Sequence, residues 1–276
     1  MLPPVWYNAN IPMFFDAAER KTALVTGASS GIGFALAREL AHDGFNLVLV
    51  ARHEDVLLLR AAELTTSTGV EAMVIPADLS LPTGPIEVCR ELEYHGVRVD
   101  ALVNNAGFGV HGYFAATDWQ RELEMMSLNM LGLTRLTKLL LGPMLSRGSG
   151  RILNVASTAA FEPGPLMAVY YATKAYILSF SEALHEELRG SGVTVTVLCP
   201  GPTRTKFQER ANLHHLRLMR GHLADPAVVA RVGVAGMLAG KAVVVPLFRN
   251  KLGVFLTRVL PRRMVRRLVH WLGEEG

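Results

Sequence analysis

Short apolar segments alternate with longer segments of helical pattern along most of the chain. The apolar segments are continuous rather than alternating, which is typical of strands covered on both faces. Seven strands are predicted, at Thr22–Thr26, Asn46–Ala51, Val70–Pro76, Ala101–Asn104, Arg151–Ala156, Val193–Leu198 and Ala242–Pro246. Helices are predicted between them, at Gly31–Asp43, Glu54–Thr66, Ile86–His95, Trp119–Leu145, Val169–Arg189 and Pro226–Leu238.

This alternation predicts an α/β fold with a doubly wound, seven-stranded parallel sheet flanked by helices. Ligands of such sheets bind beyond the carboxyl ends of the strands, so functional motifs are expected directly after strands. No internal repeat or long linker interrupts the pattern. We divide the chain into an N-terminal arm (1–20), the α/β domain (21–248) and a basic helical C-terminal extension (249–276).

Composition excludes several classes of protein. Half of the 276 residues are hydrophobic and 19% are charged, so the chain can bury a large core and is not disordered. Cys89 and Cys199 form no disulfide framework or CxxC motif, and the histidines lack partners at metal-ligand spacing. We therefore predict no metal site and a reducing, cytoplasmic location. No apolar run reaches the ~18 residues of a spanning helix, and Met1–Phe15 lacks the basic start of a secretory signal.

Positive charge is concentrated near the C-terminus. Seven Lys and Arg residues lie between Arg249 and Arg267, with no acidic residue among them. Without them the formal net charge of +4 would become slightly negative. The basic segment therefore has a role that is separable from that of the α/β domain, and we predict no nucleic-acid partner.

A glycine-rich turn follows the first predicted strand and opens the next helix. Its glycines allow backbone N–H groups to approach a pyrophosphate, and the helix N-terminus adds a favourable dipole. The spacing Gly-x-x-x-Gly-x-Gly differs from the general dinucleotide fingerprint, and a plain strand–helix turn is the alternative. Either serine would cap the helix or bind a phosphate. The predicted phosphate site consists of Gly27, Ser29, Ser30, Gly31, Ile32 and Gly33.

The end of the second predicted strand bears on the choice of cofactor. An acidic residue about 20 positions after the glycines binds the ribose 2′-hydroxyl of NAD, but Ala51 and Arg52 stand there in this chain. A guanidinium pairs with a 2′-phosphate through two charge-assisted bonds. We therefore predict NADP (NADPH) as the cofactor, with NAD less favoured. The alternative is a solvated Arg52 that opens the next helix.

Further motifs follow the other strands, and together they resemble the short-chain dehydrogenase/reductase family. The motifs are Thr26–Gly33, Asp78-Leu79, Asn104–Gly107, Asn129, Ser157, Tyr170-x-x-x-Lys174 and Pro200–Thr203. Each is common alone, but their order and spacing are specific, and the similarity extends from Lys21 to Pro246. The resemblance implies a Rossmann-type fold and the activity of an NADP-preferring carbonyl reductase.

Tyr170 and Lys174 lie one helical turn apart, so they share a face of their helix. A phenol has a pKa near 10, and a nearby ammonium lowers it by roughly 1–3 units. Such tuning would suit Tyr170 to exchange a proton with a carbonyl oxygen at neutral pH. Tyr171 competes for this role, but Ala175 stands one turn after it. We therefore expect Tyr170 to be the general acid/base and Tyr171 to pack or to line the pocket.

The resemblance assigns further residues to the reaction. Ser157 would hydrogen-bond the substrate oxygen, with Thr158 as the less favoured candidate. Asn129 would kink its helix and hold a water that leads to Lys174; a surface asparagine is the alternative. Lys174 would also bind the ribose hydroxyls. Asn104 would secure the central sheet beside the cofactor.

The same resemblance places cofactor contacts after the third, fourth and sixth strands. Asp78 would bind the adenine amino group, unless it caps the next helix, and Leu79 would line the adenine pocket. Thr203 and Thr205 are both candidates for the nicotinamide end, and the pattern Pro-Gly-x-x-x-Thr favours Thr205. The remaining contacts implied are Asn105, Ala106, Gly107, Tyr170, Lys174, Pro200 and Gly201.

The segment Lys206–Leu223 interrupts the alternation of strands and helices. Family members use this stretch, about 203–224 here, as a lid over the substrate. Phe207 in the lid, with Phe161 and Met167 from the loop before Tyr170, is expected to line the substrate pocket. An apolar ketone or aldehyde is therefore the predicted substrate; the alternative is a lid that only packs.

Beyond Pro246 the chain departs from the family pattern. Residues 250–272 are apolar and basic together, and Pro261 is expected to separate two helices, the second at Arg262–Leu272. Its arginine-rich and apolar faces are typical of a peripheral helix on a membrane surface. An extension that packs on another subunit or on its own chain, with solvated arginines, is the favoured interpretation of the two. The N-terminal arm is long enough to pack against a neighbour.

These features predict an NADPH-dependent oxidoreductase that reduces a carbonyl group to an alcohol, reversibly. The alternatives are an NAD-linked alcohol dehydrogenase, a dinucleotide-binding protein without catalysis, and a membrane-surface module dominated by the basic tail. The helices Trp119–Leu145 and Val169–Arg189 resemble those that pair subunits in the family. A homo-oligomer, either a dimer or a tetramer, is therefore expected.

Overall fold

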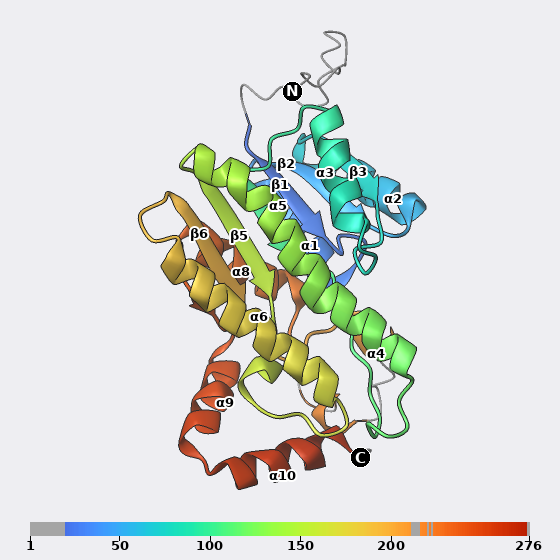
Figure 1. Cartoon of the computed structure of the whole chain (residues 1–276), viewed down its shortest axis with the longest axis vertical. Coiled ribbons are helices and arrows are strands. Elements are labelled where there is room, and N and C mark those ends of the chain that lie inside the picture. The colour runs from blue at the N-terminus through green and yellow to red at the C-terminus, as the bar shows by residue number, and fades with distance from the viewer. Residues whose placement is uncertain (1–19, 211–215, 220, 222, 275–276) are drawn as a thin grey trace, which may run out of the picture.

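The centre of the molecule is a parallel sheet of seven strands in the order β3-β2-β1-β4-β5-β6-β7 (Figure 1). The computed structural model describes residues 20–210, 216–219, 221 and 223–274, so the predicted N-terminal arm lies outside the described residues except for Arg20. The sheet confirms the predicted doubly wound fold. Its strands are β1 (Thr22–Thr26), β2 (Asn46–Ala51), β3 (Ala72–Pro76), β4 (Ala101–Asn104), β5 (Gly150–Val155), β6 (Val193–Leu198) and β7 (Val243–Val244).

Helices cover both faces of the sheet. Consecutive residues of β1 alternate between the two layers, because Ala23 and Val25 pack in one apolar core and Leu24 packs in the other. All three side chains are fully buried, which explains why the strand is continuously apolar. The first layer contains α1 (Gly31–His42), α2 (Glu54–Thr68) and α8 (Pro226–Leu238). The second contains α3 (Gly84–Tyr94), α5 (Leu133–Ser146) and α6 (Ala168–Glu187).

The predicted long helix Trp119–Leu145 is not one regular helix. It consists of α4 (Trp119–Met126), a π-helical segment η1 (Ser127–Gly132) and α5. π-Helical turns within α-helices occur frequently at functional sites, and this one carries Asn129. The ends of the other predicted elements agree with the structure to within a few residues.

Short elements fill the predicted lid between β6 and α8. They are α7 (Phe207–Arg210) and the 3-10 turn η3 (Arg217–Met219). An isolated bridge between Thr203 and Ala224 holds the two ends of the lid together. Residues 211–215, 220 and 222 of the lid lie outside the described residues.

Two helices follow β7, with Pro261 between them as predicted: α9 (Phe248–Val259) and α10 (Arg262–Gly273). Both lie at the end of the molecule toward which the strands point (Figure 1). Val265 and Val269 of α10 are buried, and α10 contacts η3, so this helix packs in part on its own chain. Within the described residues, no helix combines the length and the hydropathy that a bilayer crossing requires.

Candidate active site

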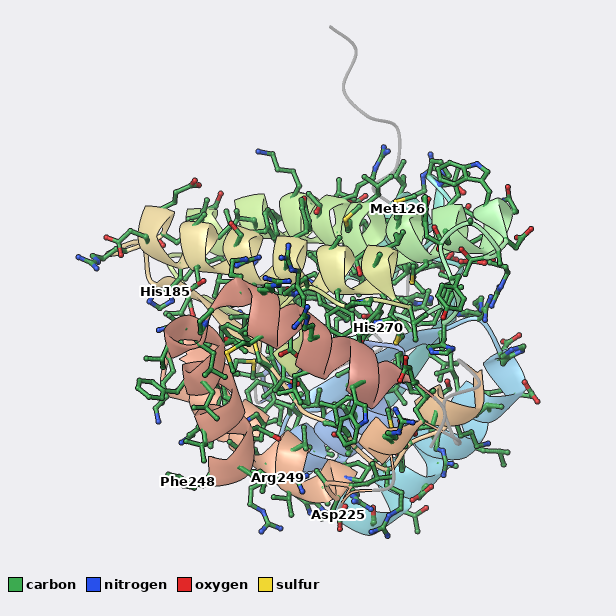
Figure 2. The ribbon with its side chains drawn as sticks, turned by 90° about the horizontal axis from the view of Figure 1, so that it is seen from below. Met126, His185, Asp225, Phe248, Arg249 and His270 are labelled. Carbon is green, nitrogen blue, oxygen red and sulfur yellow. The ribbon has the colours of Figure 1, made fainter. Side chains whose placement is uncertain are left out.

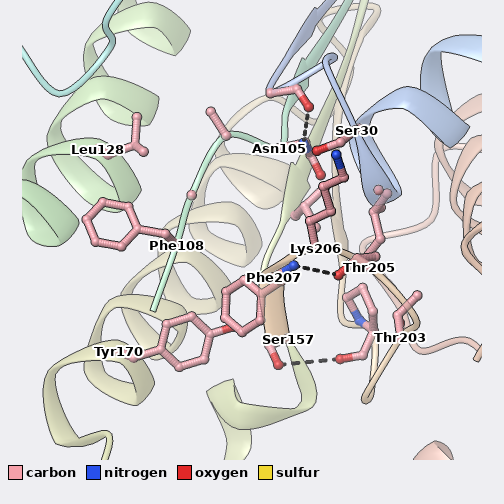
Figure 3. A pocket seen from close by; sticks show the side chains of 18 of the residues that line it. Ser30, Asn105, Phe108, Leu128, Ser157, Tyr170, Thr203, Thr205, Lys206 and Phe207 are labelled. Carbon is pink, nitrogen blue, oxygen red and sulfur yellow. Dashed lines mark hydrogen bonds between the residues drawn. The ribbon is translucent and has the colours of Figure 1, made fainter. Parts of the chain in front are cut away.

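A cavity of about 520 Å³ opens at the carboxyl ends of the strands, where the fold predicts a ligand site. The loops after β1, β2, β3 and β4 form one side, which we name the cofactor end. The other side, named the lid end, consists of the loop before α6, α7 and η3. Figure 3 shows Ser30 and Asn105 toward the first side, and Tyr170, Ser157 and Phe207 toward the second. Apart from Asn104, Asn129 and Phe161, every residue that the sequence assigned to cofactor, catalysis or substrate lines this cavity.

The glycine turn after β1 is compact because side chains would not fit there. Gly27 has a φ of +66°, and its N–H donates to the Val50 carbonyl oxygen at 2.8 Å. A Cβ on Gly33 would overlap the Gly27 carbonyl oxygen and Asn105 Nδ2. Ser30 stands at the N-cap of α1, but its hydroxyl makes no capping bond and the residue lines the cavity. The turn therefore exposes the N-terminus of α1 to the pocket, as a dinucleotide phosphate requires.

Asn105 locks the loop after β4 to the glycine turn. Its Nδ2 donates to the Thr26 carbonyl oxygen at 2.9 Å, and its backbone N–H donates to Thr26 Oγ1 at 2.9 Å. One residue earlier, Asn104 Nδ2 donates to Asn154 Oδ1 and Thr137 Oγ1, both at 2.9 Å and both buried. Asn104 thus ties β4 to β5, and Asn105 holds the cofactor end in place.

Arg52 and Asp78 stand at the ends of β2 and β3. Arg52 is exposed at the cavity, and it makes no hydrogen bond or ion pair with any residue that the structure describes. Asp78 lines the cavity with Leu79, and its Oδ1 accepts from the N–H and the hydroxyl of Ser80, at 2.9 and 2.6 Å. The helix-cap alternative for Asp78 is wrong, since Thr83 is the N-cap of α3.

Tyr170, Lys174 and Ser157 meet at the floor of the cavity. Tyr170 and Lys174 are buried on one face of α6, and Lys174 Nζ donates to the Val155 carbonyl oxygen at 3.0 Å. Ser157 follows β5; its Oγ accepts from the Ala159 N–H at 3.1 Å and donates to the Pro200 carbonyl oxygen at 3.4 Å (Figure 3). The ends of β5 and β6 therefore fix the serine beside the tyrosine.

Burial, rather than Lys174, dominates the protonation of Tyr170. Desolvation raises the pKa of Tyr170 to about 12, against a smaller lowering by its hydrogen bond with the Ser157 side chain. Lys174 Nζ lies 5.8 Å from the centre of the phenol ring. Burial likewise lowers the pKa of Lys174 to about 8. The expected net lowering of the pKa of Tyr170 is therefore not found: Lys174 is not among the causes of the shift, and the desolvation of the phenolate outweighs the effect of Ser157.

Asn129 is buried behind the cavity instead of lying on the surface. Its Nδ2 donates to the Phe108 carbonyl oxygen and to Thr173 Oγ1, both at 3.1 Å, and its Oδ1 accepts from the Phe108 N–H at 3.2 Å. A Cβ on Gly107 would lie 2.8 Å from Asn129 Oδ1 and 3.7 Å from Lys174 Nζ. Asn129 and Lys174 are therefore neighbours, and the π-helical turn η1 places the Asn129 amide beside Lys174.

Tyr171 also lines the cavity, in a different setting from Tyr170. Burial raises the pKa of Tyr171, and the charges of Glu162 and Tyr170 add to the rise. Glu162 itself lines the lid end, and partial burial raises its pKa to about 7. For Tyr170 a hydrogen bond with Ser157 opposes the rise in pKa, whereas no such bond opposes it for Tyr171.

Apolar side chains enclose the lid end. Phe207 lies 5.6 Å from Tyr170 between ring centres, and Met167 packs with both. Phe161 is a correction to the predicted substrate residues: it does not line the cavity but packs beside Ile177 and Leu178 below it. Phe161 ends the 3-10 turn η2 (Thr158–Phe161), and its ring is partly buried against this cluster.

Thr203 and Thr205 both line the cavity, and Gln208 holds them. Gln208 Oε1 accepts from the Thr205 N–H at 3.1 Å, and its Nε2 donates to the Thr203 carbonyl oxygen. Thr205 also stands against Gly31, at 3.1 Å from a Cβ placed there. The lid thus reaches back to the glycine turn.

Sequence reasoning missed several cavity residues. Gln208 lies three positions after Thr205, a spacing that suits a local side-chain bond, and Phe108 directly follows the Asn104–Gly107 motif. Both could have been found from these neighbours. Lys206 and Met219 lie within the predicted lid but were not singled out there. No sequence signal points to others such as Arg121, Leu128 and Glu162, because they approach from separate elements.

The fold and the site define an α/β oxidoreductase that binds NAD(P). Residues 21–215 match the short chain dehydrogenase family, and the chain belongs to this family. Ketoacyl reductase HetN of Nostoc sp. is 35% identical over 66% of this chain, and the match spans 63% of that protein's length. Mouse 17-beta-hydroxysteroid dehydrogenase type 3 is 29% identical over 95% of this chain and 87% of its own. A short-chain dehydrogenase from Sphingobium yanoikuyae in complex with NADPH has a TM-score of 0.78 at 32% identity, over 85% of this chain and 91% of that one.

Proposed function

We propose that this protein is an NADPH-dependent carbonyl reductase that converts an apolar ketone or aldehyde to an alcohol, reversibly. The observation that carries the proposal is the meeting of Tyr170, Ser157 and Lys174 between a glycine turn and an apolar lid. The glycine turn fits a dinucleotide, because the N-terminus of α1 is open to the cavity there and the Ser30 hydroxyl makes no capping bond. When bound there, the dinucleotide supplies the hydride.

The protein's own groups handle the substrate oxygen and its proton. Ser157 Oγ would donate a hydrogen bond to that oxygen from a fixed position. With a pKa of about 12, Tyr170 is protonated at neutral pH and can donate its phenolic proton to the oxygen. Lys174 would return a proton to Tyr170, and Asn129 would hold the water that leads to Lys174, since the two side chains are buried neighbours behind the cavity.

NADP preference is proposed on the basis of Arg52. Its guanidinium is exposed at the cofactor end without a protein partner in the described chain. The position before it, where NAD-binding proteins carry an acidic residue, is Ala51. The NADPH complex of the Sphingobium relative is compatible with this preference. An NAD-linked alcohol dehydrogenase of the same family is the alternative.

The lid end favours a bulky apolar substrate. Met167, Phe207 and Met219 line it, and Phe108 from the loop after β4 adds a further apolar side chain to the cavity. Apolar contacts of this kind supply affinity in proportion to buried area. Two relatives are named as a ketoacyl reductase and a 17-beta-hydroxysteroid dehydrogenase. We therefore propose a fatty-acyl or steroid-like ketone in preference to a small polar sugar.

The direct test follows NADPH oxidation over a panel of apolar ketones. Tyr170→Phe should lower kcat by roughly 10²–10⁴-fold, the usual contribution of a general acid, while the dissociation constant for NADPH changes little. Tyr171→Phe is the matched control, since it removes the neighbouring phenol from the same helix and should keep most of the activity. Equal losses in both variants would remove Tyr170 from its role. NADPH binding without turnover on any ketone would favour a non-catalytic dinucleotide-binding protein.

Cofactor preference has its own test. Arg52→Asp should shift the ratio of kcat/KM for NADPH over NADH by roughly 10–100-fold toward NADH, because a charge-assisted bond contributes about 1.5–3 kcal/mol. Arg98→Asp, an exposed cation remote from the cavity, is the control. A wild-type enzyme that prefers NADH would contradict the proposed role of Arg52.

A homo-oligomer is also proposed. Leu131 of η1, Leu139 of α5 and Tyr176 of α6 are exposed on neighbouring elements. The Tyr176 hydroxyl lies 2.8 Å from Thr134 Oγ1 across them. Exposed apolar side chains gathered in this way are typical of an interface. Light scattering should give a mass of two or four chains, and Leu131→Glu should lower it.

A further inference from the structure

Helix α9 exposes its apolar side to solvent. Its outward apolar residues follow the spacing i, i+4, i+7, i+8 and i+11, which is one face of an α-helix. Their exposed fractions are between 42 and 80%. This apolar stripe consists of Phe248, Leu252, Phe255, Leu256 and Val259. Phe248, the most exposed of the five, is labelled at the periphery of the molecule in Figure 2.

The side of α9 that faces the protein is more polar. Asn250, Val254 and Thr257 are partly buried there. Asn250 Nδ2 donates to the Pro246 carbonyl oxygen at 2.9 Å, and its Oδ1 stands 2.5 Å from a Cβ placed on Gly201. A surface helix of a globular protein normally buries its apolar face and exposes its polar face. In α9 this order is reversed, so the stripe is not explained by the packing of the described chain.

Helix α10 also exposes an apolar face. Val265 and Val269 of α10 are buried against the rest of the protein, whereas the side chains of Met264, Leu268 and Trp271 are 50–56% exposed. These three follow the spacing i, i+4 and i+7, so they also share one face. The two helices together expose eight large apolar side chains in 26 residues, from Phe248 to Gly273.

Cations border the apolar residues. At about 100° per residue, Lys251 and Arg258 flank one side of the α9 stripe and Arg249 flanks the other. Helix α10 adds Arg262, Arg263, Arg266 and Arg267, and all seven cations of the two helices are exposed. No acidic residue occurs from Phe248 to Gly273. Long basic side chains can reach lipid headgroups while an adjacent apolar stripe enters the acyl region.

We propose that α9 and α10 form a docking surface for an anionic lipid bilayer. Each helix has 12 residues, about 18 Å at 1.5 Å per residue, which is too short to span a bilayer but sufficient to lie in its interface. A second copy of the chain fits this surface less well, because two faces with seven cations each would repel one another.

The docking surface is joined to the lid. Arg217 of η3 donates to the Trp271 carbonyl oxygen at 3.0 Å and to Glu274 Oε2 at 2.9 Å, and its guanidinium lies 5.2 Å from the Trp271 ring centre. His111 Nε2 lies 3.1 Å from the Gly273 carbonyl oxygen. The bilayer would therefore lie beside the lid end of the pocket. Vesicle binding needs no turnover, so this surface and the proposed reductase activity can fail independently.

Co-sedimentation with vesicles tests the surface. The full chain should pellet with vesicles of phosphatidylcholine and phosphatidylglycerol, and much less with phosphatidylcholine alone. Replacing four arginines of α10 by glutamine (R262Q, R263Q, R266Q and R267Q) should weaken binding by about 100-fold or more, since each cation at an anionic surface contributes on the order of fivefold. Replacing Phe255, Leu256 and Val259 by serine should weaken it by about tenfold or more, because apolar area no longer enters the bilayer.

Matched controls separate this surface from net charge and net hydropathy. The charge control replaces four exposed cations elsewhere, with R38Q, R90Q, R189Q and K241Q. The apolar control is Leu59→Ser, at a leucine of α2 that is 71% exposed. Both controls should bind the anionic vesicles as the wild type does. A charge control that weakens binding as much as the α10 variant would overturn the proposal, because binding would then follow net charge alone.

Trp271 gives a second readout. In a W6F/W119F background it is the single tryptophan, and anionic vesicles should shift its fluorescence emission to the blue. Unchanged emission together with no pelleting would overturn the proposal. A second result would also overturn it: if the protein without vesicles were an oligomer that dissociates when the apolar stripe is replaced by serine, a second copy of the chain would occupy the surface.

Discussion

Hydrogen bonds to the backbone of neighbouring strands, one of them from the Asn105 side chain, hold the cofactor end of the pocket, whereas side chains of the lid hold much of the lid end. The Gly27 N–H donates to the Val50 carbonyl oxygen, and Asn105 bonds the backbone of Thr26. In the lid, Gln208 holds the two threonines, and the Arg217 guanidinium holds the C-terminal extension. The first geometry is dictated by the sheet, so it tolerates little change. The second depends on individual side chains, so substitutions there should have graded effects.

The largest effect is expected at the cofactor end, from Gly33→Ala. The new methyl group would overlap the Gly27 carbonyl oxygen. Gly27 is held to β2 by its hydrogen bond with Val50, and Gly33 lies in the first turn of α1, so neither backbone can move away freely. We expect loss of NADPH binding and a destabilisation of about 2–4 kcal/mol, similar to overpacking in a core. Calorimetric titration with NADPH and urea unfolding measure the two quantities.

Gly142→Ala is the control for this substitution. Gly142 is exposed within α5, and a Cβ there meets nothing within 4 Å. Alanine should therefore stabilise the helix by about 0.5–1 kcal/mol and leave NADPH binding intact. If Gly33→Ala bound NADPH as well as the wild type does, the cofactor end would not be as rigid as the comparison requires.

This rigidity also explains why the cofactor end could be predicted from the sequence. Gly33 and Asn105 must have these identities because backbone atoms approach closely, and such constraints leave motifs in the chain. The strands were predictable for the related reason that both faces of the sheet are covered. The kink at Asn129 was expected, but its π-helical form was not, because hydrogen-bond shifts within a helix leave no periodic signal.

The lid end was harder to predict, because its properties arise from contacts between distant segments. Phe161 is an apolar residue of the kind that lines a substrate pocket, but its side chain packs against a core cluster instead. The pKa of Tyr170 depends on how completely the folded chain excludes water from the phenol, which the spacing to Lys174 does not report. The contact of Arg217 with Glu274 joins residues 57 positions apart.

A smaller, pH-dependent effect is expected at the lid end, from Glu162→Gln. Burial raises the pKa of Glu162 from 4.5 to about 7. Because the folded protein binds the Glu162 proton more tightly than the unfolded chain does, the protonated carboxyl contributes its full stability below about pH 4.5. This contribution is lost as the pH rises through 7, where the buried carboxyl must ionise. The neutral glutamine avoids this loss. The variant should equal the wild type near pH 4.5 and exceed it by about 1–3 kcal/mol at pH 8.

Urea unfolding at several pH values measures this difference. Glu187→Gln is the control, because Glu187 is exposed on α6 and does not line the cavity. Its difference from the wild type should be independent of pH. If the difference in unfolding free energy between Glu162→Gln and the wild type were also independent of pH, the carboxylate would be in contact with water at the lid end. The contrast in structure between the lid end and the cofactor end would then be weaker.

The smallest effect is expected where the lid meets the C-terminal extension, from Arg217→Gln. The Arg217–Glu274 pair is partly exposed, so its loss should cost at most about 1 kcal/mol of stability. The lid, however, loses the contacts that join η3 to α10. We therefore expect KM for an apolar ketone to rise severalfold, with kcat and the dissociation constant for NADPH nearly unchanged. Arg189→Gln, which breaks an exposed ion pair with Glu186, should leave all three unchanged. A fall in NADPH affinity for Arg217→Gln would contradict the independence of the two ends, because the lid would then be shaping the glycine turn through Thr205 and Gly31.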